Sequence, residues 1–341
     1  NIMSYLIIIL APLLIHLVSK FLENNSILLN YSGDAHQKFV TKNKIPLSGG
    51  FFIFLYFTIL FDNQIYFIIF LFLIFILGSF SDLKIFDSPK IRLLFQVSIL
   101  FFFISLTGLT LENTKIIIID KVINLEIYNY CFVLFCMLIL INGTNFIDGL
   151  NTNVLGYYII ISLFMFGINK DFFLNDFSNW YLWICFLLIV YFFNLFNRLF
   201  IGDSGAYVLG LIYGYLLISF FNNTENLSSL YIILLVWYPC FELLFSIIRK
   251  FKFNKSPILA DTKHFHQLLY LMIKKIFKLS NFLSNILSAS LINLYNFFII
   301  LLASFHPNDS QFQMMIIIVN IIVYVCFYLN FFKKIYLRIR N

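Results

Sequence analysis

The sequence has little charge. Asp, Glu, Lys and Arg make up only 11% of its 341 residues, whereas 61% are hydrophobic, and the mean hydropathy is +0.92. Soluble domains carry about 25% charged and about 45–50% apolar residues, so this composition excludes a soluble globular protein. Apolar runs that approach the roughly 20 residues needed to cross a bilayer recur along the chain. We therefore expect an all-α, polytopic integral membrane protein with a single domain over residues 1–341.

Metal-type cysteine spacing, internal repeats and a secretory signal are also missing. The five cysteines lie within apolar runs, where we expect small buried hydrophobic residues rather than metal ligands. We find no inverted repeat of the kind from which many transporters are built. The first apolar segment has no basic leader and no small-residue cleavage site, so it does not resemble a signal peptide.

Basic residues are concentrated in alternate loops. One side collects Lys20, Lys38, Lys42, Lys44, Lys84, Lys90, Arg92, Arg198, the run from Arg249 to Lys278 and the tail from Lys333 to Arg340, whereas the other keeps Lys115, Lys121 and Lys170. This is the positive-inside asymmetry. It places the amino terminus outside and accounts for the net charge of +7 without a nucleic-acid partner.

Ten or eleven membrane helices are predicted from the apolar runs. The segments are Ile2–Val18, Phe51–Phe61, Ile65–Phe80, Leu93–Thr107, Tyr130–Ile141, Leu155–Ile168, Trp180–Phe193, Ala206–Phe221, Leu230–Ile248, Ile286–Ser304 and Met314–Phe331. In the outer segment Leu109–Tyr128, the stretch KIIIIDKVINLEI suggests a small β-hairpin. The basic amphipathic stretch Gln267–Ser280 suggests a helix in the membrane interface.

Polar residues interrupt these runs at the predicted inner helix ends, where an ionisable group is costly unless it lines a wet cavity or binds something. In INGTNFIDGLN, Asn142, Asn145 and Asp148 recur every three residues and would share one helix face within about 120°. Gly149 then offers a helix stop. The alternative is a helix end whose side chains only satisfy loose backbone groups, and the spacing does not separate the two.

The segment FIGDSGAYVLG places Asp203 between two glycines at a predicted helix start. A lone carboxylate there suits Mg²⁺, which uses one or two carboxylates plus substrate phosphates. Alternatively, Asp203 or Ser204 caps the helix. Phe200, three residues earlier, is more often a packing residue than a base-stacking one.

Two further polar segments complete the candidates. In SDLKIFDSPKIRLLFQ, Asp82 ends an apolar helix and is a candidate base or metal neighbour. Its basic neighbours Lys84, Lys90 and Arg92 are either phosphate contacts or ordinary interfacial charges. In the segment from Glu242 to Gln267, His264 and His266 share a side if the chain is extended there. Arg249 and Lys263 nearby favour a phosphate-binding loop over a metal pair, and an ordinary positive-inside loop remains a competitor.

Six motifs in order resemble the polyprenyl-phosphate N-acetylhexosamine-1-phosphate transferase superfamily, glycosyltransferase family 4. They are KIPLSGG, SDLKIFDSPKIRLLFQ, NGTNFIDGLN, FIGDSGAYVLG, PCFELLFSIIRK and DTKHFHQLL. The His-x-His loop and SPKIRLL are more similar to the O-antigen and GlcNAc-1-phosphate transferase branch than to the related translocase that makes lipid I.

The resemblance implies transfer of a HexNAc-1-phosphate from a UDP-amino sugar to undecaprenyl or another polyprenyl phosphate, with release of UMP and initiation of cell-surface glycan synthesis. It implies a multi-pass protein of the bacterial inner membrane with a cytoplasmic active site, and it leaves a homodimer open. The implied catalytic residues are Asp82, Asp148 and Lys44, and the implied Mg²⁺ ligand is Asp203. The implied substrate-binding residues are Asn142, Asn145, Asn151, Phe200, Arg249, His264 and His266.

The chain departs from the family pattern at two positions that often carry aspartate, where it has Ser81 and Asn151. Two alternatives to the transferase hypothesis therefore stand beside it. One is a transporter that uses intramembrane carboxylates such as Asp82, Asp148 and Glu242. The other is a weakened homologue that binds lipid or nucleotide without turnover.

Overall fold

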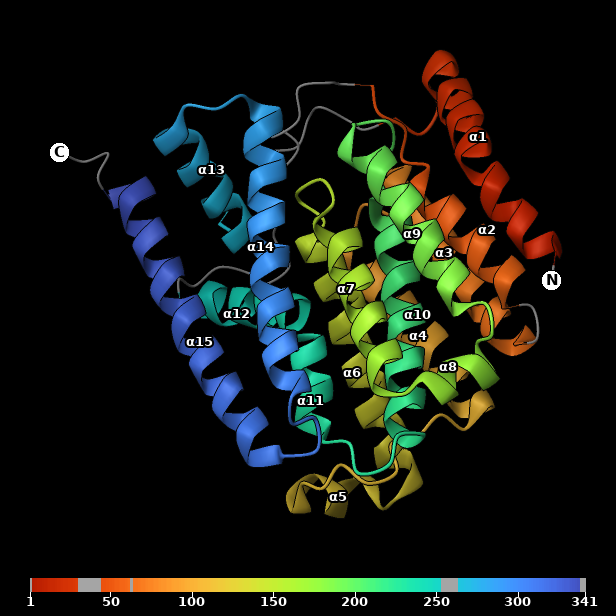
Figure 1. Cartoon of the computed structure of the whole chain (residues 1–341), viewed down its shortest axis with the longest axis vertical. Coiled ribbons are helices and arrows are strands. Elements are labelled where there is room, and N and C mark those ends of the chain that lie inside the picture. Colours follow the sequence, from red (N-terminus) through yellow and green to blue (C-terminus); the bar gives the residue numbers. More distant parts are fainter. Residues whose placement is uncertain (1, 30–43, 62–63, 253–262, 338–341) are drawn as a thin grey trace.

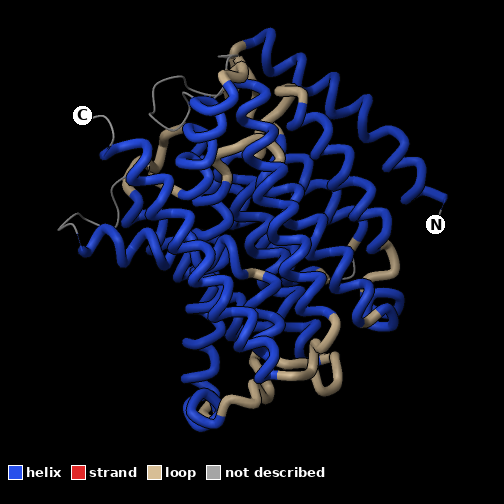
Figure 2. The backbone as a smooth tube through the Cα atoms, turned by 60° about the vertical axis from the view of Figure 1, so that its left-hand side comes forward, coloured by secondary structure: helices blue, strands red, loops and turns tan. Residues whose placement is uncertain are grey.

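The computed structural model describes residues 2–29, 44–61, 64–252 and 263–337. Within these ranges the chain is helical and none of the residues forms a strand (Figure 2). The helices are α1 (Ile2–Asn25), α2 (Gly49–Leu60), α3 (Ile65–Asp82), α4 (Pro89–Thr107), α5 (Ile117–Ile123), α6 (Glu126–Ile147), α7 (Asn153–Ile168), α8 (Lys170–Asp176), α9 (Trp180–Leu195), α10 (Gly202–Asn222), α11 (Ser229–Leu235), α12 (Trp237–Lys252), α13 (Phe265–Phe277), α14 (Asn281–Ser304), α15 (Ser310–Phe332) and the π-helical turn η2 (Lys333–Leu337).

Seven of the described helices are long and apolar enough to cross a membrane, and the number rises to nine if each of two bent pairs is one span. The bent pairs are α7 with α8 (102°) and α11 with α12 (80°). The predicted ten or eleven spans also counted α2 and α9, which are apolar but have only 12 and 16 residues. The fold class is as predicted, an all-α polytopic membrane protein, although fewer of its helices reach full spanning length.

The bend between α11 and α12 follows from Pro239. Proline has no N–H, and its ring clashes with the carbonyl four residues earlier, which here belongs to Leu235. That carbonyl instead accepts a hydrogen bond from the Tyr157 hydroxyl (2.8 Å), and the same hydroxyl accepts from the N–H of Tyr238 (3.2 Å). The predicted single span Leu230–Ile248 is therefore two helices, and α12 crosses the direction of the long helices (Figure 1).

Helix α10 forms the centre of the bundle (Figure 1). It is buried along nearly its whole length and packs against α2, α3 and α6. The outer helices α1 and α4 expose long apolar side chains, as expected of helices that face lipid. The prediction that all five cysteines are buried is wrong, because Cys131, Cys185 and Cys326 are exposed on such outward faces.

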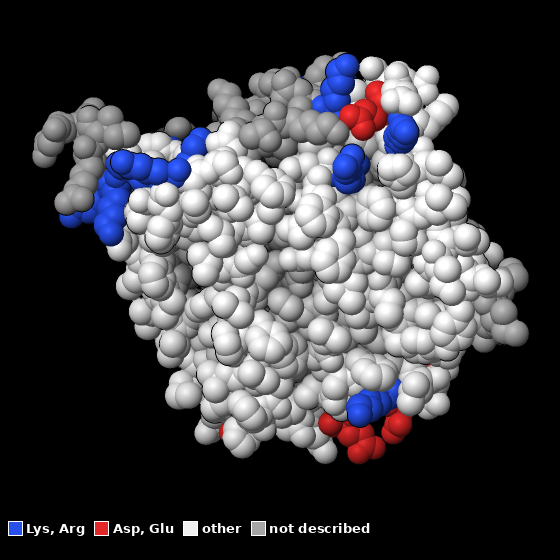
Figure 3. All heavy atoms as spheres, turned by 45° about the horizontal axis from the view of Figure 1, so that its top comes forward, with Lys and Arg blue, Asp and Glu red and all other residues white. Residues whose placement is uncertain are grey.

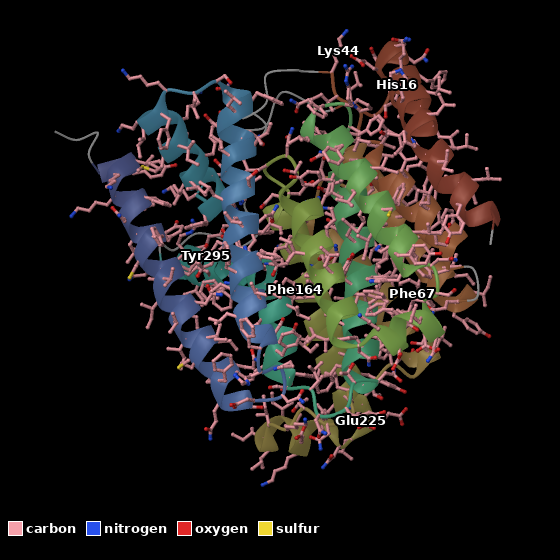
Figure 4. The ribbon with its side chains drawn as sticks, viewed as in Figure 1. His16, Lys44, Phe67, Phe164, Glu225 and Tyr295 are labelled. Carbon is pink, nitrogen blue, oxygen red and sulfur yellow. The ribbon has the colours of Figure 1, made fainter. Side chains whose placement is uncertain are left out.

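Charged residues lie towards the two ends of the bundle, on either side of a wide uncharged band (Figure 3). Lys44 lies at one end, and Glu225 lies at the other (Figure 4). The predicted β-hairpin near the second end is wrong, because that segment contains α5. Asp120 in the first turn of α5 accepts hydrogen bonds from the N–H and hydroxyl of Thr114, and a carboxylate there favours a helix start.

Candidate active site

The amino-terminal end of α10 is approached closely by α2 and α3. A Cβ atom on Gly78 of α3 would lie 2.4 Å from the Cα of Ser204, and one on Gly50 of α2 would lie 2.4 Å from the amide nitrogen of Gly205. Only glycine fits at such distances. The sequence therefore allows three helix ends to meet around the start of α10.

The segment before α2 pairs with the segment before α10. The N–H of Phe200 donates to the carbonyl of Pro46, and the carbonyl of Phe200 accepts from the N–H of Gly49, both at 2.9 Å. The Phe200 side chain is half-buried. Lys44, two residues before Pro46, is exposed at this end of the bundle (Figure 4). The base-stacking role of Phe200 and the catalytic role of Lys44 stay predictions.

Asp82, the last residue of α3, caps α10. Its Oδ1 accepts from the N–H of Asp203 (2.8 Å), and its Oδ2 accepts from the N–H (3.1 Å) and the hydroxyl (2.7 Å) of Ser204. Gly202 has φ +68°, and a Cβ there would lie 2.7 Å from the same Oδ2. A carboxylate at a helix amino terminus is stabilised by the exposed N–H groups and the helix dipole. The cap therefore comes from another helix, and not from Asp203 or Ser204 as the capping alternative expected.

Asp203 points its side chain to α4 and to the end of α3. Its Oδ2 lies 2.7 Å from Nη1 of Arg92 and accepts a hydrogen bond from the hydroxyl of Ser81. Arg92 also contacts the Ser81 hydroxyl. Two acidic side chains, one guanidinium and one hydroxyl thus meet where α3, α4 and α10 converge.

Asp148 adds a third carboxyl group to this cluster. It is the residue after α6, and its carboxylate makes no hydrogen bond to any residue that the structure describes. Burial raises the pKa of Asp148 well above the usual carboxyl range, and the neighbouring charges of Asp203 and Asp82 raise it further. Three carboxyl groups brought together against their mutual repulsion make this cluster a candidate site for a cation.

The carboxyl cluster fits Mg²⁺ better than a metal held by protein side chains alone. Among the described residues, no group of three or more His, Cys, Asp or Glu side chains has a geometry that could hold a metal ion. Asp148 has both oxygens available, and Oδ1 of Asp203 makes no hydrogen bond within the described part of the chain. One or two carboxylates completed by substrate phosphates and water are the usual Mg²⁺ ligands.

The two histidines approach the loop that carries Asp148. His264 adopts an extended conformation before α13, and its ring stacks on that of His266 with centroids 5.6 Å apart and planes 4° apart. The ring of Phe146 meets His264 edge-on at 5.0 Å. A Cβ on Gly149 would lie 2.2 Å from Nε2 of His266. Glycine at 149 therefore lets α13 and the loop after α6 come together beside Asp148.

The amides of α6 face two other helices. Asn142 donates to Oε1 of Gln96 on α4 (2.9 Å), and Asn145 lies at hydrogen-bonding distance from the hydroxyl of Tyr207 on α10 (3.5 Å). Because α6 ends at Ile147, both are helical while Asp148 is the first residue past the helix. Their predicted substrate-binding roles remain to be tested.

Two other predicted binding residues are engaged within the protein. The Asn151 side chain is buried and donates to the carbonyl of Asn194 (3.1 Å) and to Oδ1 of Asn197 (2.6 Å). Arg249 is also buried and bonds the hydroxyls of Ser246 and Tyr328 and the carbonyl of Lys263. These contacts hold the loop after α9 and the histidine segment in place, and they give both residues a structural task.

Comparison with known proteins finds two similarities. Residues 64–221 match glycosyl transferase family 4. Over 224 residues the chain is 26% identical to the undecaprenyl-phosphate alpha-N-acetylglucosaminyl 1-phosphate transferase of Thermotoga maritima, which covers 65% of this chain and 67% of that protein. The family match covers less than half of the chain, which is therefore similar to glycosyl transferase family 4. The similarity favours the transferase hypothesis over the transporter one.

The region of the chain that matches the family contains all three carboxyl residues of the cluster. It runs from α3 through α10 and ends before the histidine segment. The sequence left Arg92 open between a phosphate contact and an interfacial charge, and it did not indicate the contact between Ser81 and Asp203. Their only signal was position, because Ser81 lies at the end of α3 and Arg92 in the first turn of α4.

Proposed function

We propose that the protein transfers a HexNAc-1-phosphate from a UDP-amino sugar to a polyprenyl phosphate and releases UMP. An oxygen of the lipid phosphate forms a bond to the phosphorus that carries the sugar, and the bond from that phosphorus to the oxygen of UMP breaks. The observation that carries the proposal is the cluster of Asp82, Asp148 and Asp203 beside Arg92 at the end of a membrane bundle. The family match and the activity named for the Thermotoga maritima relative support the same reaction.

The acidic and the basic residues of the site have different proposed roles. Asp203 and Asp148 would hold Mg²⁺, which when bound neutralises phosphate charge in the donor. Asp82 fixes the backbone of Asp203 through the cap on α10. Arg92, with Lys44 and the histidines, adds positive potential where two anionic substrates must approach each other.

No general base is required for this attack. The second pKa of a phosphate monoester is about 6, so the lipid phosphate is already largely deprotonated at neutral pH. Catalysis then rests mainly on positioning and on charge neutralisation. The missing carboxylates at Ser81 and Asn151 are compatible with activity on this account.

The position of the cluster suits one soluble and one lipid substrate. The nucleotide sugar arrives from water, whereas the polyprenyl tail requires hydrocarbon beside the site. We infer that the site faces the cytoplasm at the bacterial inner membrane, because the basic loops predicted on the inner side include Lys44 and Arg92.

The test is turnover of purified full-length protein in detergent with undecaprenyl phosphate and a panel of UDP-sugars. We expect UMP release and a lipid product of matching mass, loss of both with EDTA and recovery with added Mg²⁺. Asp203→Asn should abolish turnover. Asp87→Asn is the matched control, because Asp87 is exposed in the loop between α3 and α4 and the charge change is the same. Well-folded protein that turns over no UDP-sugar would refute the proposal.

A further inference from the structure

Glu242 of α12 is buried and fully engaged. Only 1% of its surface is exposed. Its Oε1 lies 3.0 Å from Nδ1 of His264 and accepts from the N–H of Phe265 (3.2 Å), while its Oε2 accepts from the hydroxyl of Tyr324 on α15. A buried carboxylate is tolerated when its oxygens are paired in this way. The surrounding residues therefore fix both Glu242 and the nitrogen of His264 that faces it.

The second ring nitrogen of His264 is left for another partner. The ring also meets the N–H of Gln267 in a capping box at the start of α13. No other hydrogen bond joins Nε2 to a described residue, and Nε2 is not among the buried polar atoms that lack a partner. The ring is held between the stacked His266 and the edge of Phe146, two residues before Asp148. Because Nδ1–H points at the carboxylate, Nε2 is the nitrogen that the ring can offer to a ligand.

We propose that Glu242 is a positioning residue that holds His264 with Nδ1–H on the carboxylate and Nε2 directed to the phosphate groups of the substrates. This inference rests on the proposed function for the identity of the ligand. When the imidazole is protonated, Nδ1–H donates to Glu242 and Nε2–H donates to a phosphate oxygen. The carboxylate supplies the counter-charge that the cation needs in a buried place.

The charges around His264 make that counter-charge important. Titratable and charged groups face the ring or its neighbours from three helices and the preceding residue: Glu242, Arg249 and Lys250 from α12, His266 from α13, Tyr324 from α15, and Lys263. Glu242 is the single carboxylate in this set of described residues, and three of the others are cations. Without it, a protonated imidazole would lose the carboxylate that contacts Nδ1 and would keep three cations nearby.

A purely structural role is the competing account. Glu242 also accepts from the backbone of Phe265, so it fastens the first turn of α13 to α12 whatever the state of the histidine. A loss of stability or activity on substitution would not distinguish the two. The tautomer of His264 does, because helix fastening alone does not select a ring nitrogen.

The experiment uses full-length protein in detergent, without ligand and labelled with ¹⁵N-histidine. The chain has only five histidines, and His264→Asn assigns the signal. We expect a protonated Nδ1 and an unprotonated Nε2 in neutral wild-type His264. Glu242→Gln should retain this state, because an amide oxygen can still accept, and Glu242→Leu should lose it. An Nε2–H tautomer in the wild type, or no change in folded Glu242→Leu, would overturn the inference.

A second measurement covers the case in which Glu242→Leu does not fold. Glu242→Gln keeps the volume and removes the charge, so the alkaline limb of the turnover–pH profile should move to lower pH. Tyr324→Phe is the matched control, because it removes a hydrogen bond to the same carboxylate and keeps its charge, and its alkaline limb should stay in place. An identical limb in wild type and Glu242→Gln would contradict the role. Failure of the proposed function would be seen separately: the protein would release no UMP, while His264 would still show the expected tautomer.

Discussion

Gly202→Ala tests whether the cap from Asp82 organises the carboxyl cluster. Gly202 has φ +68°, and an added Cβ would lie 2.7 Å from Oδ2 and 2.8 Å from Oδ1 of Asp82. Ordinary van der Waals contact begins at 3.4 Å, so the carboxylate must move by roughly 0.7 Å. That displacement stretches the bonds that Asp82 accepts from Asp203 and Ser204.

The expected cost has two parts. A left-handed backbone at a residue with a Cβ costs about 1–2 kcal/mol. Weakening hydrogen bonds to a charged acceptor adds about 1.5–3 kcal/mol, which gives a total of roughly 2.5–5 kcal/mol. Because a misplacement of about 1 Å can reduce turnover about 100-fold, we expect at least a tenfold loss of turnover from the shifted Asp203.

Gly108→Ala is the matched control for the backbone part. Gly108 ends α4 with φ +62°, and nothing lies within 4 Å of the Cβ that would be added. Gly108→Ala should therefore lose only the backbone contribution of about 1–2 kcal/mol and keep full turnover. The assay is the apparent unfolding midpoint in detergent together with UMP release. Equal midpoints for the two variants, with wild-type turnover in Gly202→Ala, would refute the reasoning.

Three further substitutions separate functional from structural roles. Asp148→Asn should lower turnover by about 100-fold or more. Because the pKa of Asp148 is raised, the ionised carboxylate destabilises the folded wild type, and this penalty vanishes as the pH falls. The thermal stability of Asp148→Asn should therefore exceed that of the wild type by a margin that grows from pH 5 to pH 8. A margin that stays constant over that range would contradict the raised pKa. Asn151→Asp should lower the free energy of unfolding by about 1–3 kcal/mol without a gain in turnover, because a carboxylate oxygen would replace the N–H₂ group that faces the Asn194 carbonyl. Higher turnover would instead support the weakened-homologue alternative. Arg249→Ala should lower the unfolding midpoint more than Tyr328→Phe, because it removes hydrogen bonds to three acceptors. Equal midpoints would argue for a role in binding substrate.

Much of the local structure is accessible from sequence patterns. Apolar runs indicate most of the long helices, and Gly149 indicates the end of α6 to within one residue. The break before α12 was also readable, because Pro239 removes a helix hydrogen bond, although the single apolar run concealed it. The helix α5 was missed because the run of four isoleucines at 116–119, of which the last three begin the helix, suggests a strand. The bonds between Asp120 and Thr114 favour a helix instead.

Contacts between distant segments are a different matter. The cap from Asp82 to α10 joins residues 121 positions apart. No local sequence pattern predicts which two helix ends will contact each other. The same holds for the ion pair of Arg92 with Asp203 and for the carboxylate that fixes His264. Glycines at 50, 78 and 202 permit the approach, but the partners are apparent only in the folded chain.

The sequence by itself determined that this protein is a membrane helix bundle and that acidic, amide and imidazole groups occur at its helix ends, because hydropathy and the cost of burying polar groups act on each segment alone. The tertiary structure decided which of these groups share a site. It brought Asp82, Asp148 and Asp203 together and turned Asn151 and Arg249 to internal contacts. The physical reason is that electrostatic coupling depends on distances of a few ångströms between side chains, and those distances are set by how the helices pack.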